Sequence, residues 1–304
     1  MTYNKQKQFV SDHSLGLISQ IGEEETFWDL LKKMARENKL AVISACVIIL
    51  FIAAAIFAPV LSPYSPNDMD LMNRLKPPSG SHLFGTDEGG RDILTRMLYG
   101  SRVSLLAGVV PTLLSMILGM ILGMAAGFLG GFADGLIMRI ADIMLALPSM
   151  LLAMIMMFAF GNSLINVFLT LTLVNWASIA RIVRSETLRL KENEYVEAAR
   201  VIGVTRAKII FRHILPNCLP TLIVLFTLNV PSSILTESSL SFLGLGIQPP
   251  DSSWGLMINA GRQYLYNAPW LSFMPCIAIM LIVLAFNFLG DGLRDVLDPH
   301  QKNQ

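Results

Sequence analysis

Charged side chains are scarce in this sequence. Only 15% of the 304 residues are Asp, Glu, Lys or Arg, whereas 53% are hydrophobic. Because a water-soluble chain of this length needs more charge to cover its surface, the composition excludes an ordinary soluble protein and indicates an integral membrane protein. The net charge of +1 gives no reason to expect a nucleic-acid partner.

Cysteine is also scarce. Cys46, Cys218 and Cys276 lie far apart within apolar segments, without the close spacing of zinc or redox sites, and we expect them to be packing residues. The first 39 residues are polar and have no apolar run near Met1. We therefore expect no cleaved signal peptide and predict that the first apolar run is an uncleaved anchor.

Motifs of known catalytic sites are absent. The sequence has no glycine-rich phosphate loop ending in Gly-Lys-Ser/Thr, no His-Glu-x-x-His and no Gly-x-Ser-x-Gly stretch. The four histidines form no evident metal site. We expect a non-catalytic chain that binds no metal and no cofactor; if it serves transport, another polypeptide binds the ATP and Mg²⁺. A self-sufficient carrier and a membrane-embedded enzyme are the competing classes.

Long apolar runs are what the sequence does have. A membrane-spanning helix needs about 20 mostly apolar residues, and six segments qualify. With both termini in the cytoplasm, most Lys and Arg residues lie on the cytoplasmic side, as the positive-inside rule requires. The predicted fold is therefore all-α, a polytopic membrane protein with six transmembrane helices, which are Leu40–Leu61, Val103–Phe128, Ile137–Phe160, Leu164–Ile182, Leu219–Leu235 and Leu271–Leu289.

These spans divide the chain into segments. Residues 1–39 are predicted to be a cytoplasmic segment whose amphipathic helix, beginning at Thr26, lies on the inner leaflet; a plain extension of the first span is the alternative. Residues 40–61 form the first transmembrane helix. The remaining segments are an extracytoplasmic loop (62–100), a transmembrane core of five helices (101–291) with a polar cytoplasmic loop (184–217), and a cytoplasmic tail (292–304).

Two patterns within the spans indicate helix packing or bending. A glycine stripe at four-residue steps, Gly119 to Gly131, allows close approach of another helix, from this chain or from a partner subunit. Pro148 interrupts the third span and is predicted to kink it. Arg139 and Asp142, just before Pro148, are spaced to meet on one helix face.

Three asparagines lie within the predicted spans. Asn175, Asn229 and Asn287 are candidates for lining a water-filled pathway, although hydrogen bonding between helices explains them equally well. No Asp, Glu, Lys or Arg lies at the middle of a predicted span, and ion-coupled carriers usually place one there. This pattern argues against a carrier that powers itself.

The polar loop 184–217 is predicted to form two helices about a sharp turn. In the first, Ser185–Ile202, Tyr195, Ala199 and Ile202 would share an apolar face. Gly203 is placed to adopt the left-handed conformation that ends this helix. Thr205 can cap the second helix, Arg206–Leu215, before Pro216. The apolar face either meets a cytoplasmic partner or packs on the chain itself.

The same loop resembles a known family. Glu197-Ala198-Ala199, then Gly203, then Leu215-Pro216 match the E-A-A…G…L-P motif of type I ABC importer permeases, with His213 at a position that is usually Ile. A second set of residues resembles the signature before the second span in the C-type subunits of the dipeptide, oligopeptide and nickel branch. That set is Gly85, Thr86, Asp87, Gly90, Arg91, Asp92 and Arg102.

The resemblance implies a type I ABC importer transmembrane fold and a set of partners. These are a second, similar permease subunit in a heterodimer, two ATPase subunits or domains that bind ATP and Mg²⁺, and an extracytoplasmic solute-binding protein, in a bacterial or archaeal inner membrane. It implies that Glu197 pairs with a basic group of an ATPase, that Ala198 and Ala199 allow close approach, and that Gly203 makes the turn. The implied cargo is a dipeptide or oligopeptide; glutathione, nickel or a metal chelate are the alternatives.

Overall fold

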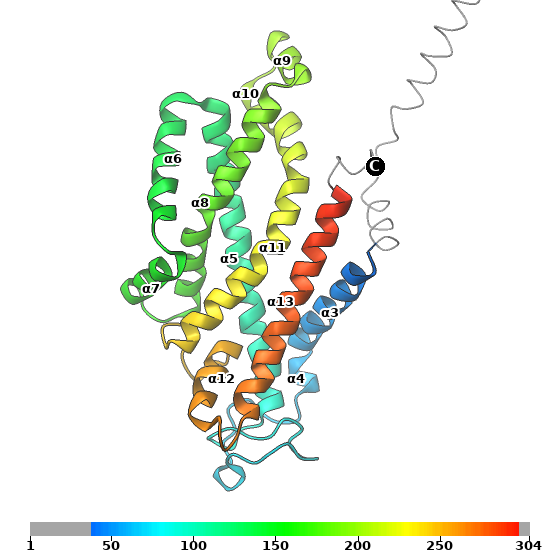
Figure 1. Ribbon diagram of the computed structural model, residues 1–304, viewed down its shortest axis with the longest axis vertical. Coiled ribbons are helices and arrows are strands. Elements are labelled where there is room, and N and C mark those ends of the chain that lie inside the picture. The colour runs from blue at the N-terminus through cyan, green and yellow to red at the C-terminus, as the bar shows by residue number, and fades with distance from the viewer. Residues whose placement is uncertain (1–37, 298–304) are drawn as a thin grey trace, which may run out of the picture.

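A computed structural model describes residues 38–297, which form helices joined by turns (Figure 1). The predicted interfacial helix near Thr26 and residues 298–304 of the predicted tail lie outside this range. Five of the described helices are long and apolar enough to cross a membrane, and a sharply bent pair makes a sixth if it counts as one span. The predicted all-α fold with six spans is confirmed in this form.

The bundle is elongated, with α9 near one end and α12 near the other (Figure 1). We call these the α9 end and the α12 end. The short elements are 3₁₀ turns at Leu71–Asn73 and Arg262–Tyr264 and a π turn at Ile210–Ile214. The α-helices are α3 (Lys39–Ile56), α4 (Ala58–Leu61), α5 (Ile93–Leu129), α6 (Gly131–Ala146), α7 (Ser149–Phe160), α8 (Leu164–Lys191), α9 (Glu194–Val201), α10 (Arg206–Ile209), α11 (Leu215–Phe242), α12 (Trp254–Gly261) and α13 (Trp270–Leu297).

The most extensive contact joins α5 to α8, and the glycine stripe makes it possible. A Cβ atom added at Gly123 would lie 2.5 Å from the carbonyl oxygen of Ala180, and one at Gly127 would lie 2.8 Å from Cβ of Thr187. Gly119 is equally close to Ile179. The stripe therefore packs within the chain, up to but not including Gly131, whose surroundings are open.

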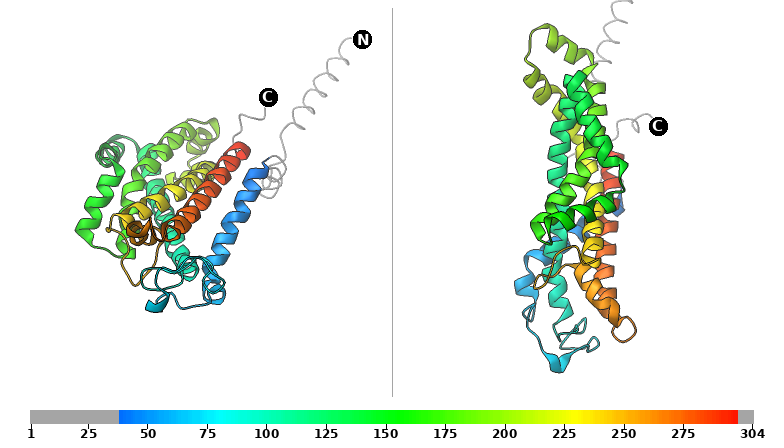
Figure 2. Two further views of the ribbon diagram at one scale, coloured as in Figure 1. Left: turned by 60° about the horizontal axis from the view of Figure 1, so that its bottom comes forward. Right: turned by 90° about the vertical axis from the view of Figure 1, so that its left-hand side faces the viewer.

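The predicted third span is two helices. α6 ends before Leu147, and α7 begins after Pro148 at an angle of 95° to it. Proline lacks the N–H that would continue the hydrogen-bond ladder, and it disfavours a helical conformation in the residue before it. The bend expected at Pro148 is confirmed, and it is sharp enough to turn α7 across the bundle (Figure 2).

Two predicted boundaries are corrected. α5 begins at Ile93, inside the predicted loop 62–100, because the side chain of Asp92 accepts a hydrogen bond from the backbone N–H of Thr95 and caps the helix. α13 continues to Leu297, past residue 291 where the core was predicted to end. In both cases the helix continues into residues that include polar and charged side chains beyond the apolar run, so hydropathy alone places the start of α5 too late and the end of α13 too early.

Candidate functional site

The α9–α10 turn, residues 194–209, projects at the α9 end of the bundle (Figure 1). Gly203 has a φ of +82°, and the backbone N–H of Val204 reaches back to the carbonyl of Ala199 at 3.0 Å. This is the left-handed helix ending that glycine favours. No other atom lies within 4 Å of an added Cβ at Gly203, so the glycine requirement comes from backbone conformation and not from crowding.

The buried face of α9 differs from the predicted one. Val196 and Ala199 are buried and pack with Ile209, Ile214 and Cys218. The prediction that Tyr195 and Ile202 share this face is wrong, because both side chains are exposed. The helix ends at Val201, so residue 202 no longer follows helical spacing.

The tip of the turn leaves two large apolar side chains in the open, because Val201 and Ile202 are each 79% exposed. Phe211, in the π turn that follows α10, is 69% exposed. Exposed apolar side chains on a polar loop are typical of a protein contact site. The alternative that an apolar face packs on the chain itself holds for Val196 and Ala199, and contact of the exposed side chains with a partner stays a prediction.

Charge at the turn is exposed and locally paired. The Glu197 carboxylate accepts a hydrogen bond from Nη1 of Arg200 at 3.0 Å, one helical turn away, and both side chains are about half exposed. Such surface pairs contribute only ~0–1 kcal/mol, so Glu197 can exchange Arg200 for another cation at little cost. Ala198 beside it is exposed and Ala199 is buried.

Leu215 and Pro216 open α11 without interrupting the chain's helical course. Residues 206–242 run as one helix through the π turn Ile210–Ile214. Pro216 has no N–H to offer an α-helical bond, and the wide turn lies directly before it. The loop prediction of a separate second helix ending before Pro216 is thus corrected, because α10 is continuous with the spanning helix α11.

The signature residues before α5 build the loop at the α12 end. Oδ1 of Asp87 accepts hydrogen bonds from the backbone N–H groups of Gly89 at 2.8 Å and Arg91 at 3.0 Å, and Oδ2 accepts one from Nε of Arg91 at 2.7 Å. Thr86 Oγ1 accepts a bond from the backbone of Lys76. These contacts fix the shape of the loop.

Two glycines and an arginine of the signature complete that architecture. Gly90, with φ of +74°, touches Asp70 so closely that an added Cβ would lie 1.8 Å from its carbonyl oxygen, and Gly85 lies against Lys76 and Trp270. Arg102 donates from Nη2 to the carbonyl of Ile56 at 2.9 Å, which joins α5 to the end of α3.

The three candidate asparagines occupy separate positions. Asn175 on α8 donates weakly to Ser233 Oγ on α11 at 3.4 Å, whereas Asn229 on α11 donates to the carbonyl of Leu225 in its own helix at 2.7 Å. Asn287 is half-buried on α13. Within residues 38–297 no hydrogen bond joins any two of the three asparagines, so the structure does not gather them into one cluster.

The ion pair expected within α6 forms between helices instead. Asp142 accepts a hydrogen bond from Nη2 of Arg181 on α8 at 2.7 Å, and Arg139 is exposed beside it. Nearer the α9 end, Arg184, about one turn further along α8, forms a two-pronged pair with Asp134 of α6. The spacing in the sequence predicted the wrong partner for Asp142. The observed partner, Arg181, lies in a distant part of the chain.

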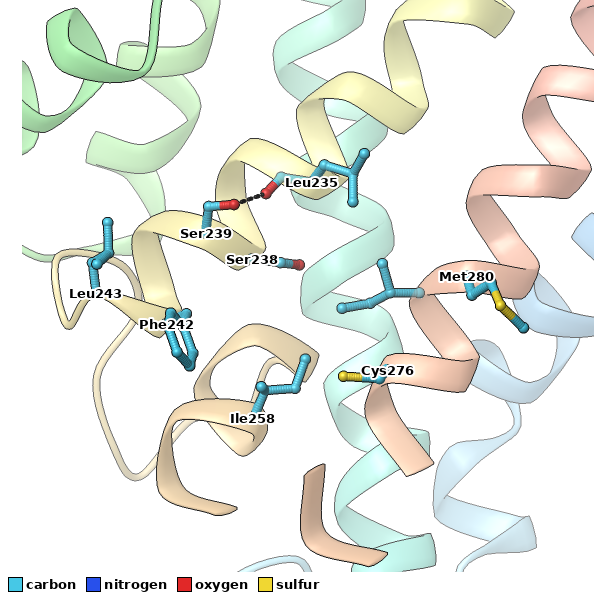
Figure 3. A pocket seen from close by; sticks show the side chains of 9 residues that line it. Leu235, Ser238, Ser239, Phe242, Leu243, Ile258, Cys276 and Met280 are labelled. Carbon is cyan, nitrogen blue, oxygen red and sulfur yellow. Dashed lines mark hydrogen bonds between the residues drawn. The ribbon is translucent and has the colours of Figure 1, made fainter. Parts of the chain in front are cut away.

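An open, mostly apolar pocket of about 470 Å³ lies toward the α12 end between α11, α12 and α13 (Figure 3). Ser239 of α11 borders it, and its hydroxyl bonds the carbonyl of Leu235 in the same helix. The pocket can hold an apolar group. Its lining residues are Leu235, Ser238, Ser239, Phe242, Leu243, Ile258, Cys276, Ile279 and Met280.

Glu237 directly precedes the pocket residue Ser238, and the sequence analysis did not identify it. It is fully buried and accepts a hydrogen bond from Ser241 Oγ at 2.7 Å. It lies in α11 two residues past the predicted end of the fifth span, and the Ser-rich stretch around it was the available signal. Within residues 38–297 no group of three His, Cys, Asp or Glu side chains is placed to hold a metal ion.

Comparison with known proteins identifies the family of this chain. Residues 115–303 match the family described as the binding-protein-dependent transport system inner membrane component, and residues 26–78 match the N-terminal transmembrane domain of oligopeptide transport permease C. The chain belongs to this family. The resemblance drawn from the two motifs is confirmed, and the permease is a membrane component of a binding-protein-dependent ABC transport system.

Named relatives of the permease share most of its length. A dipeptide transport system permease protein of Alkalihalophilus pseudofirmus is 45% identical over 91% of each chain. An oligopeptide transport system permease protein of Bacillus subtilis is 43% identical over 87% of each chain. A glutathione transport system permease protein of Shigella flexneri is 45% identical over 91% of this chain and 92% of its own.

Proposed function

We propose that this permease forms half of the translocation pathway of an ABC importer for dipeptides and oligopeptides. Its partners in this proposal are a second permease subunit in a heterodimer, two ATPase subunits or domains that carry ATP and Mg²⁺, and an extracytoplasmic solute-binding protein. The observation that carries the proposal is the projecting α9–α10 turn, with its left-handed Gly203 and exposed apolar tip, in a chain of this family.

The proposed orientation follows from the turn. The α9 end faces the cytoplasm, both termini are cytoplasmic, and the α12 end faces outward in the inner membrane. The excess of Lys and Arg in loop 184–217 supports this orientation through the positive-inside rule. The solute-binding protein then meets the loop built by Asp87 and Gly90.

The proposed coupling acts through the exposed surface of α9. The carboxylate of Glu197 pairs with a basic group of the ATPase, the small Ala198 side chain allows close approach, and the apolar tip of the turn enters a groove. Gly203 holds the shape of the turn, and the continuous helix from α10 into α11 carries its movement to the spanning region.

Charge reversal tests this coupling. Glu197→Lys should reduce recovery of ATPase with the tagged permease and reduce ATP-dependent dipeptide uptake, because a cation would face the basic group. Glu192→Lys is the matched control, an exposed carboxylate at the end of α8. Equal ATPase recovery and uptake for both variants would count against the proposed role of Glu197.

Glutathione is the second candidate cargo, because the Shigella flexneri relative at 45% identity is named for its transport. Competition decides between the cargoes. Excess unlabelled dipeptide should suppress uptake of a labelled dipeptide far more than excess glutathione does, and the reverse order would favour glutathione.

A further inference from the structure

Most exposed positions on the spanning helices carry large apolar side chains. On α3 these include Ile49 and Leu50, at 64% and 66% exposure, and on α13 they include Phe273 and Leu284. Side chains of this kind suit contact with lipid tails. Exposed polar side chains on a spanning helix therefore need a separate explanation.

Two adjacent helices, α8 and α11, expose polar side chains along one side. On α8, Ser178, Arg181 and Ser185 are exposed at spacings of three and four residues, which places them on one helix face. On α11, Ser232 and Ser239 are exposed at a spacing of seven. Half-buried Asn229 and Thr236 fall on the same face of α11.

Hydrogen bonds connect these faces to each other and to α6. Asn175 of α8 reaches Ser233 of α11, and Arg181 of α8 donates to Asp142 of α6 at 2.7 Å. α8 lies beside both neighbours in the bundle (Figure 1). We call this surface the polar band; its members are Asp142, Asn175, Ser178, Arg181, Ser185, Asn229, Ser232, Thr236 and Ser239.

The exposure of the Asp142–Arg181 ion pair indicates whether the polar band faces lipid, another helix or water. The side chains of Asp142 and Arg181 are 53% and 54% exposed. Both residues lie toward the α9 end of their predicted spans and not at the middle. A charge that met lipid there would cost less than the roughly 2.5–3.5 kcal/mol of the span centre but would still be unfavourable, and burial against another helix would remove water from both charges. Contact with water avoids both costs.

The geometry points to the polar band as the wall of the water-filled translocation pathway. This inference deepens the proposed function and rests on it. The charged termini and backbone amides of a peptide would pass over hydroxyls and the Asp142–Arg181 pair, which match them in polarity. At the α12 end the band reaches the apolar pocket through Ser239, so an apolar side chain of the same peptide would find a place there.

Cysteine labelling of the assembled transporter tests the inference. With Cys46, Cys218 and Cys276 replaced by Ala, Ser178→Cys and Ser232→Cys are each compared with Leu50→Cys and Leu284→Cys. A charged methanethiosulfonate reagent is applied to right-side-out and inverted membrane vesicles, with and without ATP, because the pathway opens to one side at a time.

The expected result is labelling of both serine-derived cysteines, from at least one side, about tenfold or more faster than the leucine controls, because thiolate forms only in contact with water. Rates equal to those of the controls at both positions would overturn the inference and favour a partner helix or lipid on this face. Dipeptide uptake is measured on the same vesicles. Fast labelling without uptake would count against the peptide proposal and leave the polar band standing.

Discussion

Backbone conformation at Gly203 determines which residues the α9–α10 turn tolerates. Its φ of +82° lies in the left-handed region, where the Cβ of an L-residue approaches the following carbonyl. This costs roughly 1–2 kcal/mol, and more for a β-branched side chain. Open space around the residue means that no neighbour adds to this cost.

Gly203→Val should therefore reshape the turn and reduce ATP-dependent uptake. A strain of about 1–2 kcal/mol corresponds to a 5–30-fold shift in the population of the native turn. Gly203→Asn is the control of similar size, because Asn tolerates the left-handed conformation. Uptake is measured at equal amounts of permease in the membrane; equal losses for both variants would mean that side-chain bulk matters, not conformation.

Single residues also show where sequence reasoning ends. The left-handed conformation of Gly203 was predicted, because residues close together in the sequence determine where a helix ends. The partner of Asp142 was not, because Arg181 lies 39 residues away and only the packing of α6 on α8 brings the two together. Glu237 was missed for a similar reason, as its burial depends on neighbouring helices that no local pattern reveals.

At the scale of elements, the α5–α8 contact depends on Gly123. An added Cβ would meet backbone at 2.5 Å, and backbone cannot move aside as a flexible side chain can. Gly123→Ala should lower the Tm of the purified permease, since overpacking typically costs about 1–3 kcal/mol.

The matched control is Gly135→Ala on α6, where an added Cβ meets no atom within 4 Å. Both variants gain roughly 0.5–1 kcal/mol of helix propensity from the Gly-to-Ala change, so their difference isolates packing. A Tm for Gly123→Ala at or above that of Gly135→Ala would contradict the close contact.

Elements differ in how far the sequence predicts them. Uniform apolar runs predicted α3, α5, α8, α11 and α13, because each crosses the bundle as one segment. The third run was predicted as one span, and only its Pro148 indicated the bend between α6 and α7. The buried face of α9 was misassigned because the predicted helix Ser185–Ile202 is divided in the structure, where α8 ends at Lys191 and α9 runs only from Glu194 to Val201.

At the scale of the whole molecule, the two ends should lie on opposite sides of the membrane. Ile202 and Tyr266 are exposed at the α9 end and the α12 end respectively. In a background with the three native cysteines replaced by Ala, an impermeant thiol reagent on intact cells should label Tyr266→Cys and spare Ile202→Cys. Inverted vesicles from cells that lack the ATPase subunits, in which no partner covers Ile202, should give the opposite result.

Labelling of both cysteines from one side would contradict the spanning arrangement, and the reverse order would contradict the proposed orientation alone. Neither outcome would alter family membership, which rests on the comparisons.

The helix that runs from Arg206 to Phe242 has a mechanical consequence. At 1.5 Å per residue its 37 residues follow a path of about 55 Å, which contains the π turn and the internal prolines Pro220 and Pro231 and bends within α11 (Figure 1). One end begins beside Gly203 and the other borders the apolar pocket. Under the proposed function, one unbroken helix therefore joins the ATPase-facing turn to the apolar pocket about seven to ten helical turns away, and the α11 part of the polar band lies along it.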